Sequence, residues 1–316
     1  MLPQEFTLAM ADPQTEVSLW LHAVGAPQEV TRRQTTVCTA PLVLCVAFHG
    51  EDRHRRDDFR NPVLRFCESG GRRRLLGEIH LAFREALSVG ASDFVLYSVR
   101  ASTNHCLPRV RLWAHYALNS YLRWRRNDPA DIRMTPVEER AACVTFIRPH
   151  FLALVSIGDR KCGNIFPMNL MGELGNGYFG FGMREQRVVT HELERAGRMA
   201  LSGVPIGKCS LPFQLAANYK KEAVDWTSLP FPVEPSSNFQ IPVPGFAGRV
   251  REMRIERSMP IGSHRFFIAR IVSDEVRDST LQACVVHGFY QYLRLKGDRE
   301  MLENAVAADL VNKSKS

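Results

Sequence analysis

Two neighbouring stretches of this chain read Arg148-Pro-His-Phe-Leu-Ala-Leu-Val-Ser-Ile157 and Gly163-Asn-Ile-Phe-Pro-Met-Asn-Leu-Met171. Both have the length and apolar content of buried β-strands, and a short turn separates them. We therefore expect two consecutive strands near residues 151–157 and 164–171.

The sequence on either side continues in short strands and turns. After residue 141 we expect strands near 142–146, 178–183, 247–256 and 264–273, a helix near 187–196, and an apolar segment at 283–292. Many short strands with a few helices predict a mainly β fold, a β-barrel with helical additions.

The first portion of the chain predicts a smaller α+β domain. We expect strands at 17–24, 41–48, 74–83 and 93–99, and a loop or short exposed helix at 51–74. Apolar residues at helical spacing predict a helix at 108–127 whose apolar stripe packs on the sheet. The predicted organisation is an N-terminal domain at 1–140, a barrel domain at 141–300 and a tail at 301–316. No internal repeat is evident.

Composition narrows the class of protein. The chain has 316 residues, of which 45% are hydrophobic and 23% charged, values typical of a globular protein of one or two domains. The N-terminus does not resemble a secretory signal, and the longest apolar runs are too short to cross a bilayer, so we expect a soluble cytoplasmic protein. The eight cysteines include no Cys-x-x-Cys pair, which predicts reduced thiols and no metal site.

The formal charge of +8 raises nucleic-acid binding as an alternative function. Arginines cluster at 53–60, 72–74 and 123–126, but acidic residues interrupt the first cluster at 51–52 and 57–58. We therefore rank this alternative below an ordinary solvated surface. The common catalytic motifs are missing, and the glycine-rich stretch 172–182 is interpreted as a hairpin turn, since its spacing is not that of a dinucleotide-binding loop.

An ordered set of segments resembles the flavin reductase-like family of FMN-binding split barrels, over roughly residues 144–297. Besides the two opening stretches, the segments are Tyr178-Phe-Gly-Phe-Gly-Met-Arg-Glu-Gln-Arg-Val-Val-Thr-His-Glu-Leu193, Gly197-Arg-Met-Ala-Leu-Ser-Gly-Val-Pro205, Gly262-Ser-His-Arg-Phe-Phe-Ile-Ala-Arg-Ile271 and Val286-His-Gly-Phe-Tyr-Gln-Tyr-Leu-Arg294. The resemblance implies an FMN-binding split β-barrel that forms a homodimer. It also implies hydride transfer from NAD(P)H to the flavin, with a flavin-dependent monooxygenase or another electron acceptor. FAD is the alternative cofactor.

The resemblance also indicates which residues would form the site. His287 and Tyr290 would contact the nicotinamide. Arg184, Arg187 and Thr190, at the start of the expected helix, would hold the phosphate. The predicted flavin contacts on the second opening stretch are Asn164, Phe166, Pro167, Met168, Asn169, Leu170 and Met171.

The second opening stretch departs from the family pattern. The family commonly has Thr-x-Ser where this chain has Pro167-Met-Asn169. Two hydroxyl groups near the flavin are thus replaced by one amide and apolar bulk. This change favours a second hypothesis, a non-catalytic FMN-binding protein for electron transfer or sensing.

Overall fold

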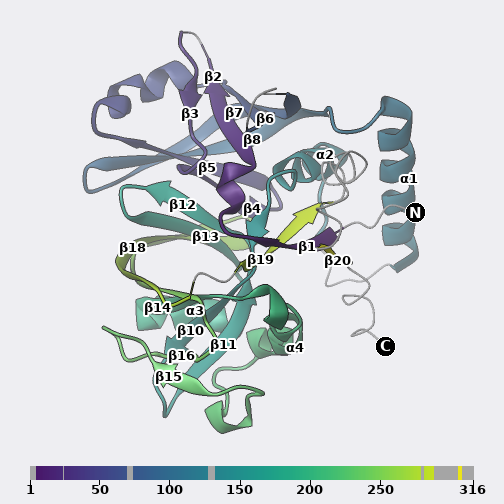
Figure 1. The fold of residues 1–316 in the computed structure, drawn as a ribbon. Coiled ribbons are helices and arrows are strands. Elements are labelled where there is room, and N and C mark those ends of the chain that lie inside the picture. Colours follow the sequence, from purple (N-terminus) through teal and green to yellow (C-terminus); the bar gives the residue numbers. More distant parts are fainter. Residues whose placement is uncertain are drawn as a thin grey trace.

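The computed structural model describes residues 5–23, 25–69, 74–126, 132–278, 281–287 and 305–307. Two seven-stranded antiparallel sheets dominate it, stacked one above the other in Figure 1. The prediction of a mainly β fold is confirmed. In the described part of the chain, no helix has both the length and the apolar character needed to span a membrane.

The N-terminal sheet has the strand order β3-β2-β6-β7-β8-β5-β4. Its strands are β2 (Val17–His22), β3 (Gln28–Glu29), β4 (Gln34–Thr39), β5 (Leu42–His49), β6 (Val63–Glu68), β7 (Leu75–Val89) and β8 (Ser92–Asn104). As its continuous apolar run predicts, β5 is buried on both faces: one faces the core of its own half and the other faces the second sheet. The 51–74 prediction was wrong in part. The 3₁₀ helix η2 (Gly50–Phe59) is the short helix, but β6 follows it as a strand.

The C-terminal sheet has the order β11-β10-β14-β17-β18-β13-β12. Its strands are β10 (Ala153–Gly158), β11 (Gly163–Met168), β12 (Met171–Gly175), β13 (Tyr178–Arg184), β14 (Arg198–Gly203), β17 (Arg249–Ile261) and β18 (His264–Val276). The sheet curls around a core of Phe and Met side chains that includes Phe166, Phe181 and Phe267. The two opening stretches form β10 and β11, which pair antiparallel from Ala153 opposite Met168 to Gly158 opposite Gly163.

Helices connect several of the strands. They are α1 (Arg109–Arg126), α2 (Pro136–Thr145), α3 (Val188–Ala196) and α4 (Leu211–Gln214). The remaining 3₁₀ helices are η1 (Pro13–Thr15), η3 (Ile206–Lys208), η4 (Leu215–Lys220) and η5 (Trp226–Ser228). A two-stranded ribbon, β15 (Val233–Pro235) and β16 (Pro242–Pro244), lies between β14 and β17 in the sequence.

Two predictions, a strand at 142–146 and the packing of the helix at 108–127, need correction. The strand expected at 142–146 is the end of α2, because Thr135 and Glu138 form a capping box and Pro136 occupies the first turn. Helix α1 forms as predicted, but only part of its apolar stripe packs on the sheet. Leu112 is buried, whereas Trp113 and Trp124 are 72% and 76% exposed.

A small sheet joins the beginning and the end of the described chain. Strand β1 (Glu5–Met10) pairs antiparallel with β19 (Gln282–His287), which also pairs with β9 (His150–Phe151). Strand β20 (Ala305–Ala307) pairs with β1 on its other edge. This sheet holds β9 next to the start of β10, and the residues just before and within β9 line the cavity described below.

The two large sheets pack directly against each other. A shared apolar cluster contains Val43, Cys45 and Phe94 from the N-terminal sheet and Phe266 and Ile268 from the C-terminal sheet. Strand β4 contacts β12, β13 and β18 across this interface. The cavity therefore lies between two bodies that share a core.

Candidate functional site

A cavity of about 330 Å³ lies at the end of the C-terminal barrel where β10 and β17 begin and β14 ends. Its walls come from both halves: β9, β12, β13, β14 and β17 on one side, and η1 and β4 on the other. The volume falls at the lower end of the range for small-molecule sites. We therefore treat the cavity as the candidate functional site.

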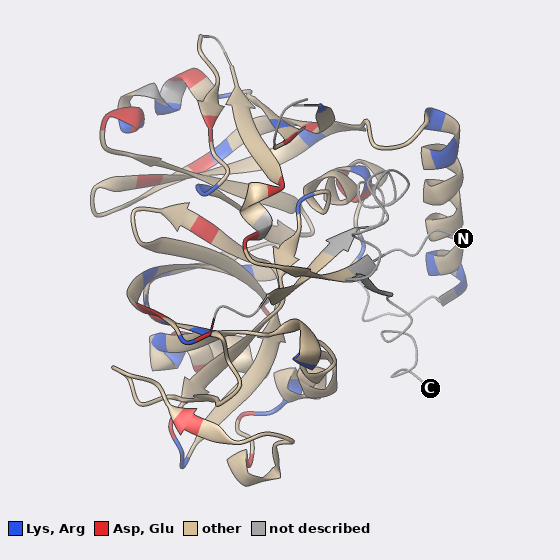
Figure 2. Cartoon of the chain, viewed as in Figure 1, with Lys and Arg blue, Asp and Glu red and all other residues tan. Residues whose placement is uncertain are grey.

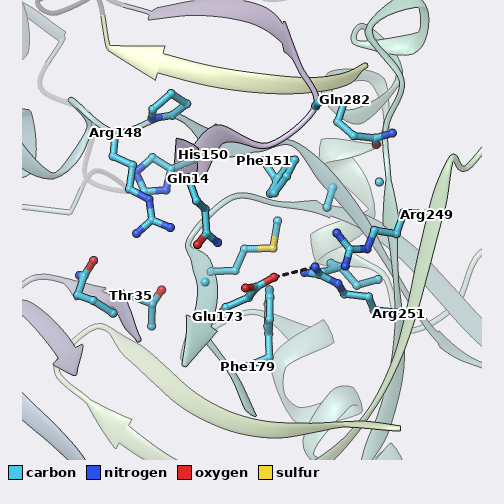
Figure 3. Close-up of a pocket in the computed structure, with 18 of the residues that line it drawn as sticks. Gln14, Thr35, Arg148, His150, Phe151, Glu173, Phe179, Arg249, Arg251 and Gln282 are labelled. Atoms are coloured by element: carbon cyan, nitrogen blue, oxygen red, sulfur yellow. Dashed lines mark hydrogen bonds and ion pairs between the residues drawn. The ribbon is translucent and has the colours of Figure 1, made fainter. Parts of the chain in front are cut away.

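Aromatic and aliphatic side chains form much of its surface. Figure 3 shows Phe151 and Phe179 on opposite sides of the cavity. The guanidinium of Arg251 lies 5.9 Å from the centre of the Phe179 ring, within the range of a cation–π contact. Leu201 and Met171 complete the apolar lining. Such walls suit a flat, largely apolar ligand.

Arg148 is the most unusual residue of the cavity. Its residue surface is only 8% exposed, yet its side chain makes no hydrogen bond or ion pair with any residue that the structure describes. In Figure 3 it extends into the cavity beside Gln14. Burial lowers the pKa of the guanidinium to about 10, so it is still charged at pH 7. Buried arginines are normally paired, so this one is poised to meet an anion or a carbonyl oxygen.

His150 lies two residues further on and also lines the cavity. Burial, and then the charge of Arg148, lower the pKa of its imidazole to about 4. The imidazole is therefore neutral at pH 7. Its Nε2 atom lies 3.4 Å from the carbonyl oxygen of Thr145, in α2.

Gln14 also lines the cavity, and its side-chain carbonyl oxygen is a hydrogen-bond acceptor without a described partner. It belongs to η1, whose first turn is capped by Asp12, and its residue surface is 7% exposed. Its Oε1 atom is buried and has no hydrogen-bond partner among the described residues. An uncompensated buried carbonyl costs free energy, and a ligand N–H at this point would satisfy it.

The other charges of the cavity are already paired. Arg251 donates from Nη2 to Glu173 at 2.7 Å and from Nε to Asp274 at 3.1 Å. Arg249 donates to both oxygens of Asp274 at 2.6 Å. Glu173 also accepts a hydrogen bond from Arg32 of the N-terminal half at 3.2 Å. These pairs fix the far wall and leave Arg148 as the charge directed at a ligand.

Of the predicted flavin contacts on the second opening stretch, Met171 alone lines this cavity. The Asn164 amide nitrogen donates to the carbonyl oxygens of Asn218 and Lys221, and Phe166 is fully buried in the barrel core. Met168 is buried, Leu170 is half-buried, and Asn169 is exposed.

The predicted phosphate contacts lie at a different place, near η4. Tyr219 donates its hydroxyl to the carbonyl oxygen of Pro167. Burial raises the pKa of this hydroxyl to about 12, and the nearby charges of Arg187 and Arg184 oppose that rise. The Thr190 hydroxyl donates a hydrogen bond to the Arg184 carbonyl oxygen at 2.8 Å. These residues are gathered as predicted at the start of α3, and their role in phosphate binding stays a prediction.

The predicted catalytic residues are not described in full. His287 ends β19, where its backbone pairs with Glu5, and its side chain is not described. Tyr290 lies outside the described residues. Their catalytic role stays a prediction.

Sequence reasoning missed Gln14, Arg148, Glu173 and Arg251 as candidate site residues. Arg148 stands at the head of the first opening stretch, but it precedes the strand and gave no signal of burial. One available signal was Arg249 and Arg251, two arginines at alternate positions of a strand, which therefore point to the same face. Gln14 becomes part of the site only through the contact between the two halves.

The arginine clusters are largely mixed with acidic residues. Arg53 and Arg56 both pair with the buried carboxylate of Asp93, at 2.8 and 3.3 Å. Figure 2 shows basic and acidic positions interspersed along the ribbon of both sheets, with a basic grouping on α1. Within the described residues, no group of His, Cys, Asp and Glu side chains has the arrangement of a metal site.

No family model matches this chain, and no curated protein does. Solved structures do match. An FMN-binding protein from Thermus thermophilus is 22% identical, over 41% of this chain and 71% of its own, with a TM-score of 0.37. The NADH:FAD oxidoreductase SgcE6 of Streptomyces globisporus is 15% identical, over 51% and 95%, with a TM-score of 0.42. The styrene monooxygenase flavin reductase of Pseudomonas putida S12 is 16% identical, over 46% and 91%, with a TM-score of 0.38.

About half of this chain is similar to flavin-binding split barrels. The resemblance predicted from the ordered segments is thereby confirmed, and at 12–22% identity it concerns the fold.

Proposed function

We propose that this chain binds a flavin in the cavity and functions as an oxidoreductase of the flavin reductase kind. The observation that carries the proposal is the pair of Arg148 and Gln14 in a cavity walled by Phe151 and Phe179. Arg148 is a largely buried residue, and neither its guanidinium nor the Oε1 atom of Gln14 has a hydrogen-bond partner among the described residues. The chemistry of these side chains supports the proposal independently of any likeness to other proteins.

The donor set fits the polar edge of an isoalloxazine ring. That edge carries a carbonyl oxygen next to an N–H group, which requires one donor and one acceptor side by side. Arg148 supplies the donor and Gln14 the acceptor. The apolar end of the ring system requires a wall without polar groups, and Phe151, Phe179 and Leu201 provide it.

The same residues would tune the cofactor. A bound flavin would supply the redox chemistry, accepting hydride from NAD(P)H. Arg148 would hold its positive charge at the polar edge, where negative charge accumulates on reduction, and the buried surroundings strengthen that interaction. His150 is neutral and contributes no second charge. The aromatic walls would exclude water from the ring.

The finer features of the proposal follow the sequence. We propose FMN as the cofactor, with FAD as the alternative, and His287 and Tyr290 as nicotinamide contacts. The second opening stretch, with Arg184, Arg187 and Thr190, is the alternative position for the flavin. A flavin-dependent monooxygenase is the proposed electron acceptor, since the similar protein of Pseudomonas putida is the flavin reductase of a styrene monooxygenase.

A second candidate function is a flavoprotein for electron transfer or sensing without hydride transfer. Pro167 and Asn169 favour it, because they stand where the family commonly has hydroxyl side chains. The two candidates share the cofactor and differ only in their response to reduced nicotinamide.

The visible absorption spectrum of the purified protein, before and after addition of FMN, tests the proposal. Anaerobic NADH and then NADPH are added next. We expect a bound-flavin spectrum that either nucleotide bleaches. A flavin spectrum that neither nucleotide bleaches would select the electron-transfer candidate. A protein that stays colourless and takes up neither FMN nor FAD would eliminate both.

A further inference from the structure

We infer that the N-terminal half is a second split barrel and that one chain forms a complete two-barrel unit with a single open ligand site. In this arrangement, the α2 helix fills the position in the N-terminal barrel that the cavity occupies in the C-terminal barrel. Strand order, strand register and side-chain packing support this arrangement, whether or not the ligand is a flavin.

The strand orders of the two sheets are identical once the strands are matched in sequence order. Matching β2 to β10, β3 to β11, β4 to β12, β5 to β13, β6 to β14, β7 to β17 and β8 to β18 converts one order into the other. A seven-stranded order that agrees at every position is improbable for unrelated sheets, because many other antiparallel orders are available.

The strand registers agree as closely as the orders. The β7–β8 hairpin turns at Gly90 and the β17–β18 hairpin at Gly262, both with a φ of +56°. Each hairpin has two register shifts, at His80/Leu81 and Phe83/Glu85 in one and at Glu252/Met253 and Ile255/Arg257 in the other. Adding one constant number to the residue numbers of the first hairpin gives the positions of both shifts and of the turn glycine in the second hairpin. Because bulges are specific features of a strand pair, this agreement indicates duplication of one barrel.

The β4–β5 and β12–β13 hairpins carry a third matching shift. It falls between Thr36 and Cys38 in one hairpin and between Glu173 and Gly175 in the other. In the same alignment Thr35 matches Gly172, and these two residues touch: a Cβ added at Gly172 would lie 3.1 Å from the Cβ of Thr35. Equivalent residues in mutual contact mark the local twofold axis of an isologous interface.

Contacts at the hairpin tips are reciprocal, as a twofold axis requires. Beside the β7–β8 tip, the hydroxyl of Tyr178 in the C-terminal half donates to the carbonyl oxygen of Val89 at 3.3 Å. At the β17–β18 tip, the amide of Ser263 donates to the carbonyl oxygen of Ala40 in the N-terminal half at 2.9 Å. The matched residues Phe94 and Phe266 both lie in the cluster between the sheets. The halves therefore meet as two copies of one subunit would.

The two barrels differ at the position of the cavity. Strand pairing matches Leu19 and Phe66 to Ala153 and Gly203, and Leu64 and Ile79 to Leu201 and Arg251. The four C-terminal residues all line the cavity, whereas the four N-terminal residues all belong to one apolar core. We call the latter four the N-terminal mouth.

Helix α2 closes the N-terminal mouth. Ala141, Val144 and Ile147, from α2 and the turn after it, are fully buried in the same core. A Cβ added at Gly77 would lie 2.8 Å from Val144 Cγ1 and 3.0 Å from Ile147 Cδ1. The residue that matches Gly77 in the open barrel is Arg249, which lines the cavity. The helix therefore occupies the place of a ligand.

The first test is the mass of the full chain in solution, by light scattering after size exclusion at micromolar concentration. The N-terminal barrel already covers the face that a second copy would use, so we expect a monomer of 35.8 kDa. This expectation departs from the homodimer that the family resemblance implies. A stable dimer of twice that mass would overturn the inference.

The second test is a double-mutant cycle on the closed mouth. Gly77→Ala should lower Tm by roughly 3 to 8 °C, because the new methyl group meets Val144 and Ile147. Gly77→Ala combined with Val144→Ala should cost less than the sum of the two single variants, since the methyl group enters the space that Val144 leaves. The matched control Arg249→Ala should shift Tm by no more than about 2 °C. An unchanged Tm for Gly77→Ala, or strictly additive losses, would contradict closure by α2.

Titration with FMN counts the open sites. We expect one FMN per chain. Two per chain would overturn the inference of a single open site. If FMN and FAD both fail to bind, the proposed function fails, while the mass and the mutant cycle still decide the two-barrel inference.

Discussion

The two barrels use matched positions in opposite ways. Where the N-terminal barrel has Phe66 and Ile79, the C-terminal barrel has Gly203 and Arg251, and a helix fills one space while the other stays open. Closed packing is the more stable arrangement, because protein interiors are dense and cavities cost free energy. The difference teaches that the cavity is a consequence of its side chains and not of the barrel fold. The open barrel also keeps a largely buried charge, Arg148, that no described residue pairs with, a cost that a ligand would offset.

The largest expected effect comes from breaking the contact between the barrels. A Cβ added at Gly182 would lie 2.0 Å from the backbone carbonyl oxygen of Val37, which cannot move aside as a side chain would. Gly182→Ala should therefore reduce the free energy of unfolding by about 3 kcal/mol or more. Urea denaturation followed by circular dichroism measures the loss.

The matched position offers the control for this variant. Strand pairing matches Gly182 to Ala47, which is fully buried and already carries a methyl group. Ala47→Gly should cost only about 1 kcal/mol. If Gly182→Ala and Ala47→Gly cost the same small amount, the barrels do not pack as closely as the structure shows.

A smaller effect is expected at a second matched pair, Glu252 and His80. Glu252 is 1% exposed, and its carboxylate accepts hydrogen bonds from Ser236, Asn238, Phe239 and Ser273. His80 is exposed, because the described residues between β6 and β7 include no counterpart of the segment that Glu252 holds. Glu252→Gln should reduce the free energy of unfolding by about 2 kcal/mol, since an amide nitrogen would face groups that donate hydrogen bonds. His80→Gln, measured in parallel, should be neutral.

The same carboxylate predicts a pH dependence. Burial alone would raise the pKa of Glu252, but the hydrogen bonds outweigh it and lower the pKa from 4.5 to about 2. A lowered folded-state pKa gives stability that is present above pH 4.5 and is lost as the pH falls toward 2. Between pH 5 and 3, the Tm of the wild type should therefore fall more steeply than that of Glu252→Gln. Parallel slopes would show that the carboxylate is not specially stabilised.

The comparison of barrels also shows what the sequence can predict. The C-terminal barrel could be predicted from the sequence because its strands contain ordered segments that resemble a known family. The N-terminal barrel was not, since its matched hairpin shares few residues with the other, among them Gly90 with Gly262 and Phe94 with Phe266. The alternation of apolar and polar residues along a strand indicates which face is buried, but it does not indicate strand order or register. The duplication is therefore visible in pairing and not in residue identity.

The cavity was less predictable than the fold for a related reason. Its key residues come from η1, β4, β12 and β17 and the segment before β9, which are far apart in the sequence. Gln14 and Arg148 become neighbours only when the two barrels meet. Strand β11 places Phe166 and Met168 in the barrel core, because alternate side chains of a strand lie on one face.

The last prediction concerns the charge that distinguishes the open barrel. Arg148→Met keeps an unbranched side chain of similar length and removes the unpaired cation. We expect FMN affinity to fall about 10- to 100-fold, the loss of one charge-assisted hydrogen bond, while Tm stays equal or rises. Titration of FMN fluorescence and thermal unfolding give the two values. Arg254→Met is the matched control, because Arg254 is exposed on β17 and does not line the cavity.

Measuring both FMN affinity and Tm distinguishes the loss of a binding contact from a general loss of stability. Substitutions that only loosen the fold lower Tm and affinity together, whereas removal of a buried, unpaired charge at a binding site separates them. If Arg148→Met binds FMN as tightly as the wild type, the flavin does not use this cavity. Arg184→Met would then be expected to lose affinity instead, which would place the flavin on the second opening stretch and leave the cavity of the open barrel to another anionic or carbonyl-bearing ligand.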